Sequence, residues 1–319
     1  MRKLTVKNIR TAIPLLLLPA AILAGCVKGT NSSSNSTKSL TATIESYSSM
    51  SILKSILVQT KLDATFNQGG PYTFFSTTDN AFTQYGLTSS YLSSLPDSTL
   101  TAMILYGAYS GNLLTTALPQ GPNAKIITMG GDSIFVTNGA NGIFVNGIQL
   151  VQGDILASNG VLDVLAGPLA PPAGNFTQKI AQADTSISFT VAAIARASQG
   201  KTNVSNILSN GGPLTFFLPD NDAWRAAGYT SASGITAMNA DSVASIVLYH
   251  IVAGRLFTSD MLSGATPVGL NQEPFTISTP TINGNTISGK NNTTKGNLIF
   301  TNILVRNGVL HIINILLKP

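Results

Sequence analysis

Few residues in this 319-residue sequence are of a type that could do chemistry. The chain has one cysteine, Cys26, and two histidines, His250 and His311. A single cysteine excludes a disulfide framework and a zinc site built on several thiolates, and two histidines are too few for a site with several imidazole ligands. The composition therefore predicts no metal site and no bound cofactor.

Carboxylates are equally sparse, because charged residues make up only 10% of the chain, against roughly 25% in an ordinary soluble domain. Asp220, Asn221 and Asp222 stand together, but the 12-residue calcium loop needs a glycine and a distal glutamate that are missing here. Asp220, Asp222 and Asp241 could form a glycosidase-like carboxylate pair, yet nothing in their spacing selects one. The motifs of serine hydrolases, zinc proteases and phosphate loops are absent. We predict that the protein is not an enzyme.

The first 25 residues resemble a secretory signal peptide. Four cations precede an apolar run from residue 12 to residue 24, which is too short for a comfortable membrane span. The run ends in Leu23-Ala24-Gly25-Cys26, which resembles the lipobox of bacterial lipoproteins. That resemblance implies that Cys26 becomes the lipidated first residue of the mature chain. An ordinary signal peptide with an unrelated cysteine is the alternative.

Residues 26–39 are predicted to be a flexible tether. The segment 28–39 has no apolar side chain to bury, so nothing would offset the conformational entropy lost on ordering it. Cleavage before Cys26 would remove four cations and lower the formal net charge from +5 to +1. A nucleic-acid partner is therefore not expected. We predict a cell-envelope protein held on the membrane by its lipid, with the outer membrane as the favoured destination and the leaflet face left open.

The rest of the chain contains two copies of one pattern. Three landmarks recur in the same order at offsets of 142, 143 and 148 residues: 70–75 and 212–217, 105–109 and 248–252, and 158–164 and 306–312. A period of this length is a whole domain rather than a solenoid unit. Prolines 168, 171 and 172 and Gly174 mark the boundary. We predict domains at 40–172 and 174–319.

Each landmark predicts a local structure. The first is a short β-branched and aromatic strand followed by a helix, with Thr78 and Asp220 at the N-cap positions. The second is an apolar helix that contains Tyr106 in copy one and the pair Tyr249-His250 in copy two, with Gly254 expected to close the helix. A buried, hydrogen-bonded core role is favoured for that pair over a ligand role.

The third landmark is an Asn-Gly turn that leads into a buried strand, expected at 161–165 and at 309–317. A hairpin is predicted around residues 138–142, while strand pairing across 283–295 is left open. Helices gather in the first half of each copy and strands in the second. This segregation predicts an α+β fold.

These motifs resemble those of the fasciclin family, whose domains carry a TxFxPTDxAF segment, a central Tyr-His pair and a final NGVIHVID-like strand. The matching segments here are residues 73–82 and 215–224, Tyr106 and Tyr249-His250, and residues 159–164 and 307–312. Copy one has Gly107 in place of the histidine and Asp163 where His311 stands in copy two. Any family role of the Tyr-His pair can therefore be carried only onto Tyr249 and His250, as a possible interaction motif.

The resemblance implies two tandem fasciclin-like domains, each with helices packed on a wedge or sandwich of mostly antiparallel strands. It also implies a non-catalytic module of cell surfaces and matrices. It predicts a lipid-anchored adhesion protein that contacts a surface or matrix protein or a glycan. The alternative is an accessory lipoprotein that binds a glycan or small molecule for an outer-membrane uptake system. That alternative requires a concave site with clustered aromatic side chains and a few converging polar groups.

Overall fold

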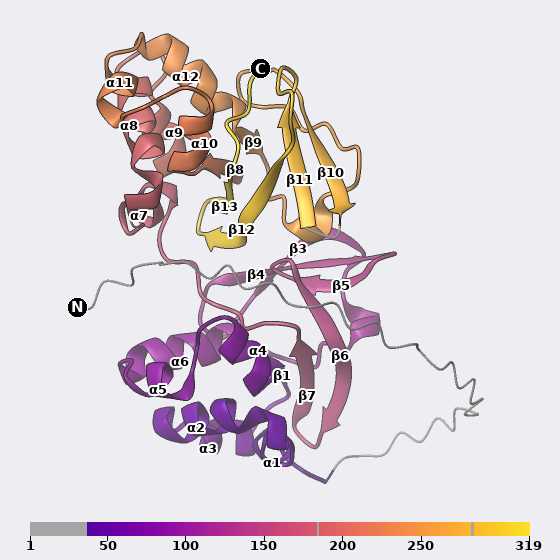
Figure 1. The fold of residues 1–319 in the computed structure, drawn as a ribbon. Coiled ribbons are helices and arrows are strands. Elements are labelled where there is room, and N and C mark those ends of the chain that lie inside the picture. The colour runs from indigo at the N-terminus through magenta and orange to yellow at the C-terminus, as the bar shows by residue number, and fades with distance from the viewer. Residues whose placement is uncertain (1–36, 184, 282–283) are drawn as a thin grey trace, which may run out of the picture. The chain divides into compact units, whose positions relative to one another are not determined.

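The computed structural model describes residues 37–183, 185–281 and 284–319. Among these residues the strands form one sheet of seven and one of six, each accompanied by helices from its own half of the chain (Figure 1). The predicted α+β class with helices packed on mostly antiparallel strands is confirmed. Figure 1 shows the helices of each half gathered to one side of their sheet.

The first half begins with short helices and ends in strands. Its helices are α1 (Leu40–Glu45), α2 (Ser51–Thr60), α3 (Leu62–Asn67), α4 (Asp79–Gln84), α5 (Ser89–Ser93) and α6 (Asp97–Tyr106), with 3-10 turns η1 (Ser48–Met50) and η2 (Thr115–Ala117). Its strands are β1 (Tyr72–Thr77), β2 (Ala108–Ser110), β3 (Gly121–Ile127), β4 (Ser133–Gly139), β5 (Gly142–Val145), β6 (Ile148–Ala157) and β7 (Gly160–Leu165). They are ordered β2-β1-β7-β6-β5-β4-β3.

The second half follows the same plan. Its helices are α7 (Phe176–Ala181), α8 (Ser188–Ala197), α9 (Val204–Asn210), α10 (Asn221–Ala226), α11 (Ala232–Thr236) and α12 (Ala240–Tyr249), with 3-10 turns η3 (Thr185–Ile187) and η4 (Thr258–Asp260). Its strands are β8 (Leu214–Pro219), β9 (Ile251–Ala253), β10 (Phe275–Thr281), β11 (Gly284–Gly289), β12 (Gly296–Val305) and β13 (Gly308–Ile313). They are ordered β10-β11-β12-β13-β8-β9.

Each sheet contains one parallel pair, and one strand of that pair lies next to an edge strand. β1 pairs with β7 and β8 pairs with β13 in the same register, and every residue of β7 and β8 is buried. The Asn-Gly turn before each last strand must approach its partner closely. A Cβ on Gly160 would lie 2.1 Å from the Tyr72 carbonyl oxygen, and one on Gly308 would lie 2.0 Å from that of Leu214. Glycine is therefore required at both positions.

Two elements end earlier than their apolar patterns predict. The helix expected to run to Gly254 ends at Tyr249, and residues 251–253 form the edge strand β9. The strand expected over 309–317 ends at Ile313, because Asn314 turns to accept a hydrogen bond from the Asn297 amide. In both cases the continuous run of apolar residues indicates that the segment is buried. It does not show where one backbone conformation ends and the next begins.

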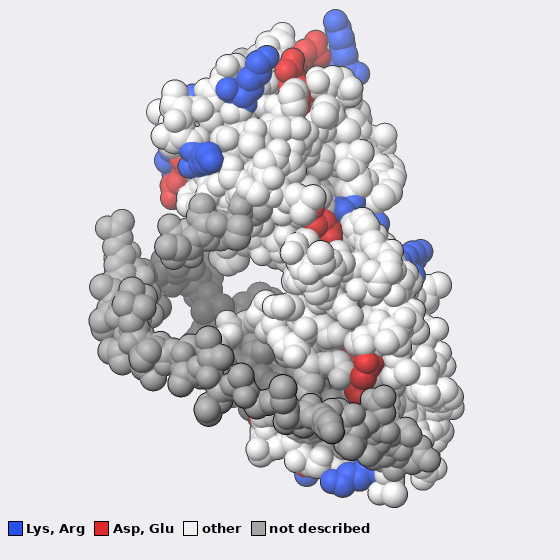
Figure 2. Space-filling model, turned by 90° about the vertical axis from the view of Figure 1, so that its right-hand side faces the viewer, with Lys and Arg blue, Asp and Glu red and all other residues white. Residues whose placement is uncertain are grey.

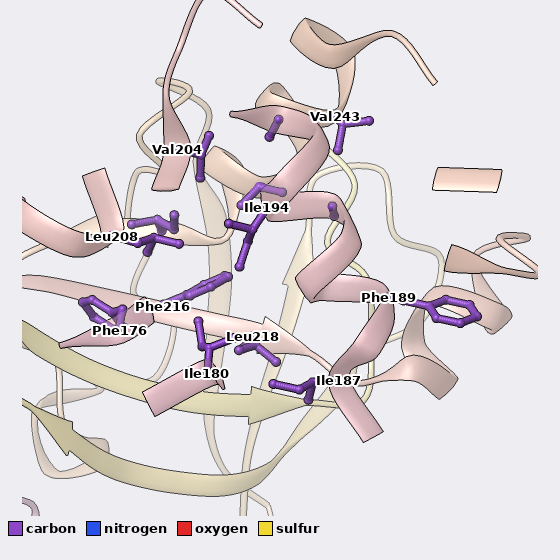
Figure 3. Packing of buried hydrophobic residues seen from close by; sticks show 14 of the residues in the cluster. Phe176, Ile180, Ile187, Phe189, Ile194, Val204, Leu208, Phe216, Leu218 and Val243 are labelled. Atoms are coloured by element: carbon purple, nitrogen blue, oxygen red, sulfur yellow. The ribbon is translucent and has the colours of Figure 1, made fainter. Parts of the chain in front are cut away.

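The helices of each half bury one apolar face against their sheet. In the second half, Phe176, Ile194, Val204 and Leu208 meet Phe216 and other side chains of β8 (Figure 3). A corresponding cluster in the first half includes Leu40, Phe66 and Phe74. Burial of this apolar area is the main stabilising contribution to each half, and it fixes where the polar motif residues lie.

Candidate functional site

The polar residues of the first motif hold helix ends together. Thr78 accepts a hydrogen bond from the Ala81 amide at 3.3 Å, and Asp220 accepts one from the Ala223 amide at 2.7 Å. Desolvation raises the pKa of Asp220. Both side chains thus satisfy a free N–H group in the first turn of their own helix.

The next residue in each motif caps a second helix. The Asp79 carboxylate accepts from the amides of Ser51 and Ile52 at the start of α2. Asn221 accepts from the Phe189 amide at the start of α8. The sequence analysis did not find this second cap, because it joins residues that are 27 to 32 positions apart.

Tyr249 and His250 are both buried at the end of α12. The Tyr249 hydroxyl donates to the Pro274 carbonyl oxygen at 2.7 Å and accepts from the Lys290 amide at 3.1 Å. His250 Nδ1 lies 2.8 Å from the Ile246 carbonyl oxygen, and Nε2 accepts from the Leu317 amide at 2.9 Å. The pair ties the C-terminal segment and the loop after β11 to the core. A surface interaction through this pair stays a prediction.

The protonation state of both imidazoles follows from their burial. Desolvation lowers the pKa of His250 and that of His311 to about 4, so both rings are neutral at pH 7. Each ring has both nitrogens within hydrogen-bond distance of backbone groups. Neither imidazole has a free nitrogen for a proton-transfer step.

A bulge in the strand before the last one is held in the same way in each half. Asp154 in β6 and Asn302 in β12 have φ of +59° and +58°. The Asp154 amide donates to Asp163 Oδ1 at 2.9 Å, and the Asn302 amide donates to His311 Nδ1 at 3.3 Å. We call these two pairs the bulge clamps. They explain the polar residue in the middle of each buried last strand.

The two clamps differ in their second polar atom. His311 Nε2 lies 2.9 Å from the Leu256 carbonyl oxygen, whereas Asp163 Oδ2 is buried without a hydrogen-bond partner among the described residues. Burial raises the pKa of Asp163 to about 6. The absence of a partner for Oδ2 is consistent with a neutral, protonated carboxyl.

Polar side chains also join the two halves. Asp260 accepts hydrogen bonds from Asn123 at 3.1 Å and from the Thr137 hydroxyl at 2.7 Å, both on strands of the first sheet. Asn302 reaches the Gly147 carbonyl oxygen at 3.3 Å. We call these contacts the domain junction. They were invisible in the sequence because the partners lie 123 to 155 residues apart.

An apolar groove lies beside the junction and has a volume of about 640 Å³. Its walls are the connecting segment 166–173, the turn from β5 into β6, and residues 299–304 of β12. Tyr85 and Phe300, which are 60% and 61% exposed, both line the groove. Asn302, Gln149 and Lys179 supply polar groups. A volume in this range and a mainly apolar lining are typical of small-molecule sites.

The remaining predictions from the sequence concern the membrane anchor and metal binding. Cys26, the signal segment 1–25 and most of the tether lie outside the described residues. Within the described ranges, no helix is both long and apolar enough to span a membrane. The same ranges contain no group of three or more histidine, cysteine, aspartate or glutamate side chains placed to hold a metal ion.

Comparisons with known proteins agree with the internal repeat. The fasciclin domain model matches residues 48–171 and again 189–319. Protein sll1483 of Synechocystis is 30% identical over 143 residues, which cover 44% of this chain and 72% of that protein. A fasciclin-like arabinogalactan protein of Arthroderma benhamiae is 26% identical over 174 residues, which cover 53% of this chain and 36% of that protein.

One solved structure is also similar. A FAS1 domain pair from the insect cell adhesion molecule fasciclin I has a TM-score of 0.41 and 13% identity, over 85% of this chain and 97% of that one. The family match itself spans most of the chain in two successive segments, and each segment contains one set of the three landmarks and one bulge clamp. The chain therefore belongs to the fasciclin family and carries two fasciclin domains in tandem.

Proposed function

We propose that this protein is a non-catalytic adhesion or interaction protein, anchored at the cell surface by a lipid on Cys26. The observation that carries the proposal is the use of the motif residues. The caps, the Tyr-His pair and the bulge clamps all bond to backbone groups of the same domain, so these side chains serve the fold. Fasciclin domains are typically non-enzymatic adhesion domains, and this supports the same reading.

The surface fits contact with other molecules rather than with a small charged substrate. Figure 2 shows a face on which the Lys, Arg, Asp and Glu side chains are few and scattered. Several large apolar side chains are exposed, including Ile127 and Leu262. Neutral, partly apolar surface loses little hydration energy on contact, which favours protein or glycan partners.

Anchoring and adhesion are tested separately. Cell fractionation of the wild-type chain and of Cys26→Ala tests the anchor, and we expect only the wild type in the membrane fraction, with a lipid-sized mass increase on its N-terminal peptide. Beads coated with the purified chain test adhesion, and we expect them to bind cells or extracted matrix above albumin-coated beads. Binding no greater than to albumin would contradict the adhesion role.

The apolar groove favours a second candidate, an accessory protein that binds a glycan or small molecule for an uptake system. Two exposed aromatic side chains, Tyr85 and Phe300, line this groove, and such a site uses aromatic side chains to contact its ligand. A glycan and metabolite array probed with the wild type and with Phe300→Ala tests this role. A ligand that loses affinity in the variant would support it, and an array without hits would count against it.

A further inference from the structure

A second cavity at the domain junction gathers cations in a chain that has few. It has a volume of about 320 Å³, and Lys125, Arg255 and Arg306 line it together with a single carboxylate, that of Asp132. The three cations come from β3, from the segment after β9 and from the turn between β12 and β13. We call this the cationic cavity. Without the four cations of the leader, the whole chain has a net charge of only +1, yet the lining of this cavity carries +2.

The guanidinium of Arg255 is fixed in place by its neighbours. Its Cζ lies 4.2 Å from the centroid of the Phe135 ring, and one terminal nitrogen donates to the Arg306 carbonyl oxygen at 2.6 Å. The Arg255 carbonyl oxygen accepts from Asn123 at 2.8 Å, which ties the same residue to the first domain. A planar guanidinium held on an aromatic face loses little further freedom when it binds a ligand.

Asp132 compensates only part of the positive charge of this lining. None of the ion pairs found among the described residues involves Lys125, Arg255 or Arg306. Among the residues that the structure describes, Arg255 Nε is buried and has no hydrogen-bond partner. Desolvation by burial lowers the pKa of the Arg255 guanidinium. A partly buried cation without a direct ion pair is costly, so an anion that entered the cavity would stabilise the junction.

We propose that the cationic cavity binds an oxyanion group of a partner molecule, a carboxylate, sulfate or phosphate, through the fork of Arg255 and the exposed cations Lys125 and Arg306. Guanidinium forks match the planar or tetrahedral oxygens of such groups in two parallel hydrogen bonds. Phe135 supplies an apolar wall against which the carrier of that group can pack.

The test measures binding of three probes, sodium glucuronate, sodium sulfate and sodium phosphate, to the purified full chain. Isothermal titration calorimetry at low ionic strength gives the affinity, because exposed cations are screened by salt. The double variant Lys125→Gln/Arg306→Gln removes two exposed cations and leaves the partly buried Arg255 to hold the junction. We expect it to weaken binding about tenfold or more, as the loss of charge-assisted hydrogen bonds implies.

The matched control is Lys201→Gln, another exposed lysine for which the structure shows no side-chain partner. We expect wild-type affinity in this control. The probe bound most tightly identifies the class of acidic group. Sulfate also stabilises proteins by exclusion from their surface, so any thermal stabilisation is counted only as the difference between the wild type and the double variant.

Two results would overturn the inference: no binding of any probe, or equal affinity in the wild type and the double variant. Both are independent of the adhesion assay. Coated beads that fail to bind cells while glucuronate still binds the cavity would refute the adhesion role alone. Beads that bind cells equally well with the double variant, which no longer binds the probes, would show that adhesion uses another surface.

Discussion

Asp163 offers a direct test of how the first domain is built. This residue is 0% exposed and lies in the interior strand β7, and burial raises the pKa of its carboxyl from 3.8 to about 6. Because the folded state holds this proton more tightly than the unfolded state, the group's contribution to stability is fully present below pH 3.8. It is lost as the pH rises through 6. The difference between the two pKa values sets an upper limit of about 3 kcal/mol on that loss.

The perturbation is Asp163→Asn, which keeps the shape and an acceptor for the Asp154 amide but carries no charge. We compare the free energy of unfolding of the first domain in the variant and in the wild type. As the pH rises from 4 to 7.5, we expect this difference to shift in favour of the variant by up to about 3 kcal/mol. Any constant effect of the substitution cancels, because only the change with pH is compared.

Hydrogen exchange of the β7 amides, followed by mass spectrometry, localises the measurement to the first domain. Wild type and variant are compared at each pH, so the intrinsic pH dependence of exchange drops out. Asp222→Asn removes a carboxylate that is 84% exposed and serves as the control, with no expected change in β7 protection. A difference between wild type and Asp163→Asn that stays the same at pH 4 and pH 7.5 would refute the reasoning.

Three further predictions concern the caps, the junction and the histidines. Thr78→Ala and Asp220→Ala each remove a capping acceptor and should each cost about 1 kcal/mol in denaturant unfolding, and unchanged midpoints would contradict the capping role. Asp260→Ala leaves Asn123 and Thr137 without their shared acceptor, so calorimetry should show the two domains unfolding in separate transitions, and one unaltered transition would show that the junction does not depend on Asp260. Acidification should destabilise the second domain as the pH falls from 6.5 towards 4, because His250 and His311 take up protons only on unfolding. Trp224, the chain's one tryptophan, reports that transition by fluorescence, and a midpoint that does not move over this pH range would exclude it.

The sequence was sufficient for features that depend on local pattern. The strand-to-helix corners at Thr78 and Asp220 follow from residue type and spacing alone, and so does the hairpin at 138–142, which forms between β4 and β5. The family resemblance followed from three landmarks in a constant order, and it is confirmed. In each of these cases the interacting residues are neighbours in the chain or repeat at a fixed offset.

The features that the sequence did not reveal depend on distant partners. Asn159 looked like a turn residue, but its side chain also accepts from the Leu40 amide and donates to the Phe66 carbonyl oxygen, so it anchors the first helices to the last strand. The junction contacts of Asp260 and Asn302 and the cations around the cavity lie on segments far apart in the chain. No periodicity or motif encodes such pairs, because they depend on how two finished domains meet.

The bulge clamps show why the two copies can diverge at the same position. Each bulge contains a residue with positive φ whose amide needs a hydrogen-bond acceptor. Asp163 and His311 both provide that acceptor. Their second polar atoms carry opposite requirements: the carboxyl is favoured in its protonated form and the imidazole in its deprotonated form. Acid should therefore strengthen the clamp of the first domain and weaken that of the second. The same backbone bulge is thus held by an acidic side chain in one domain and by a basic side chain in the other. We therefore expect the stability of the two domains to change with pH in opposite directions.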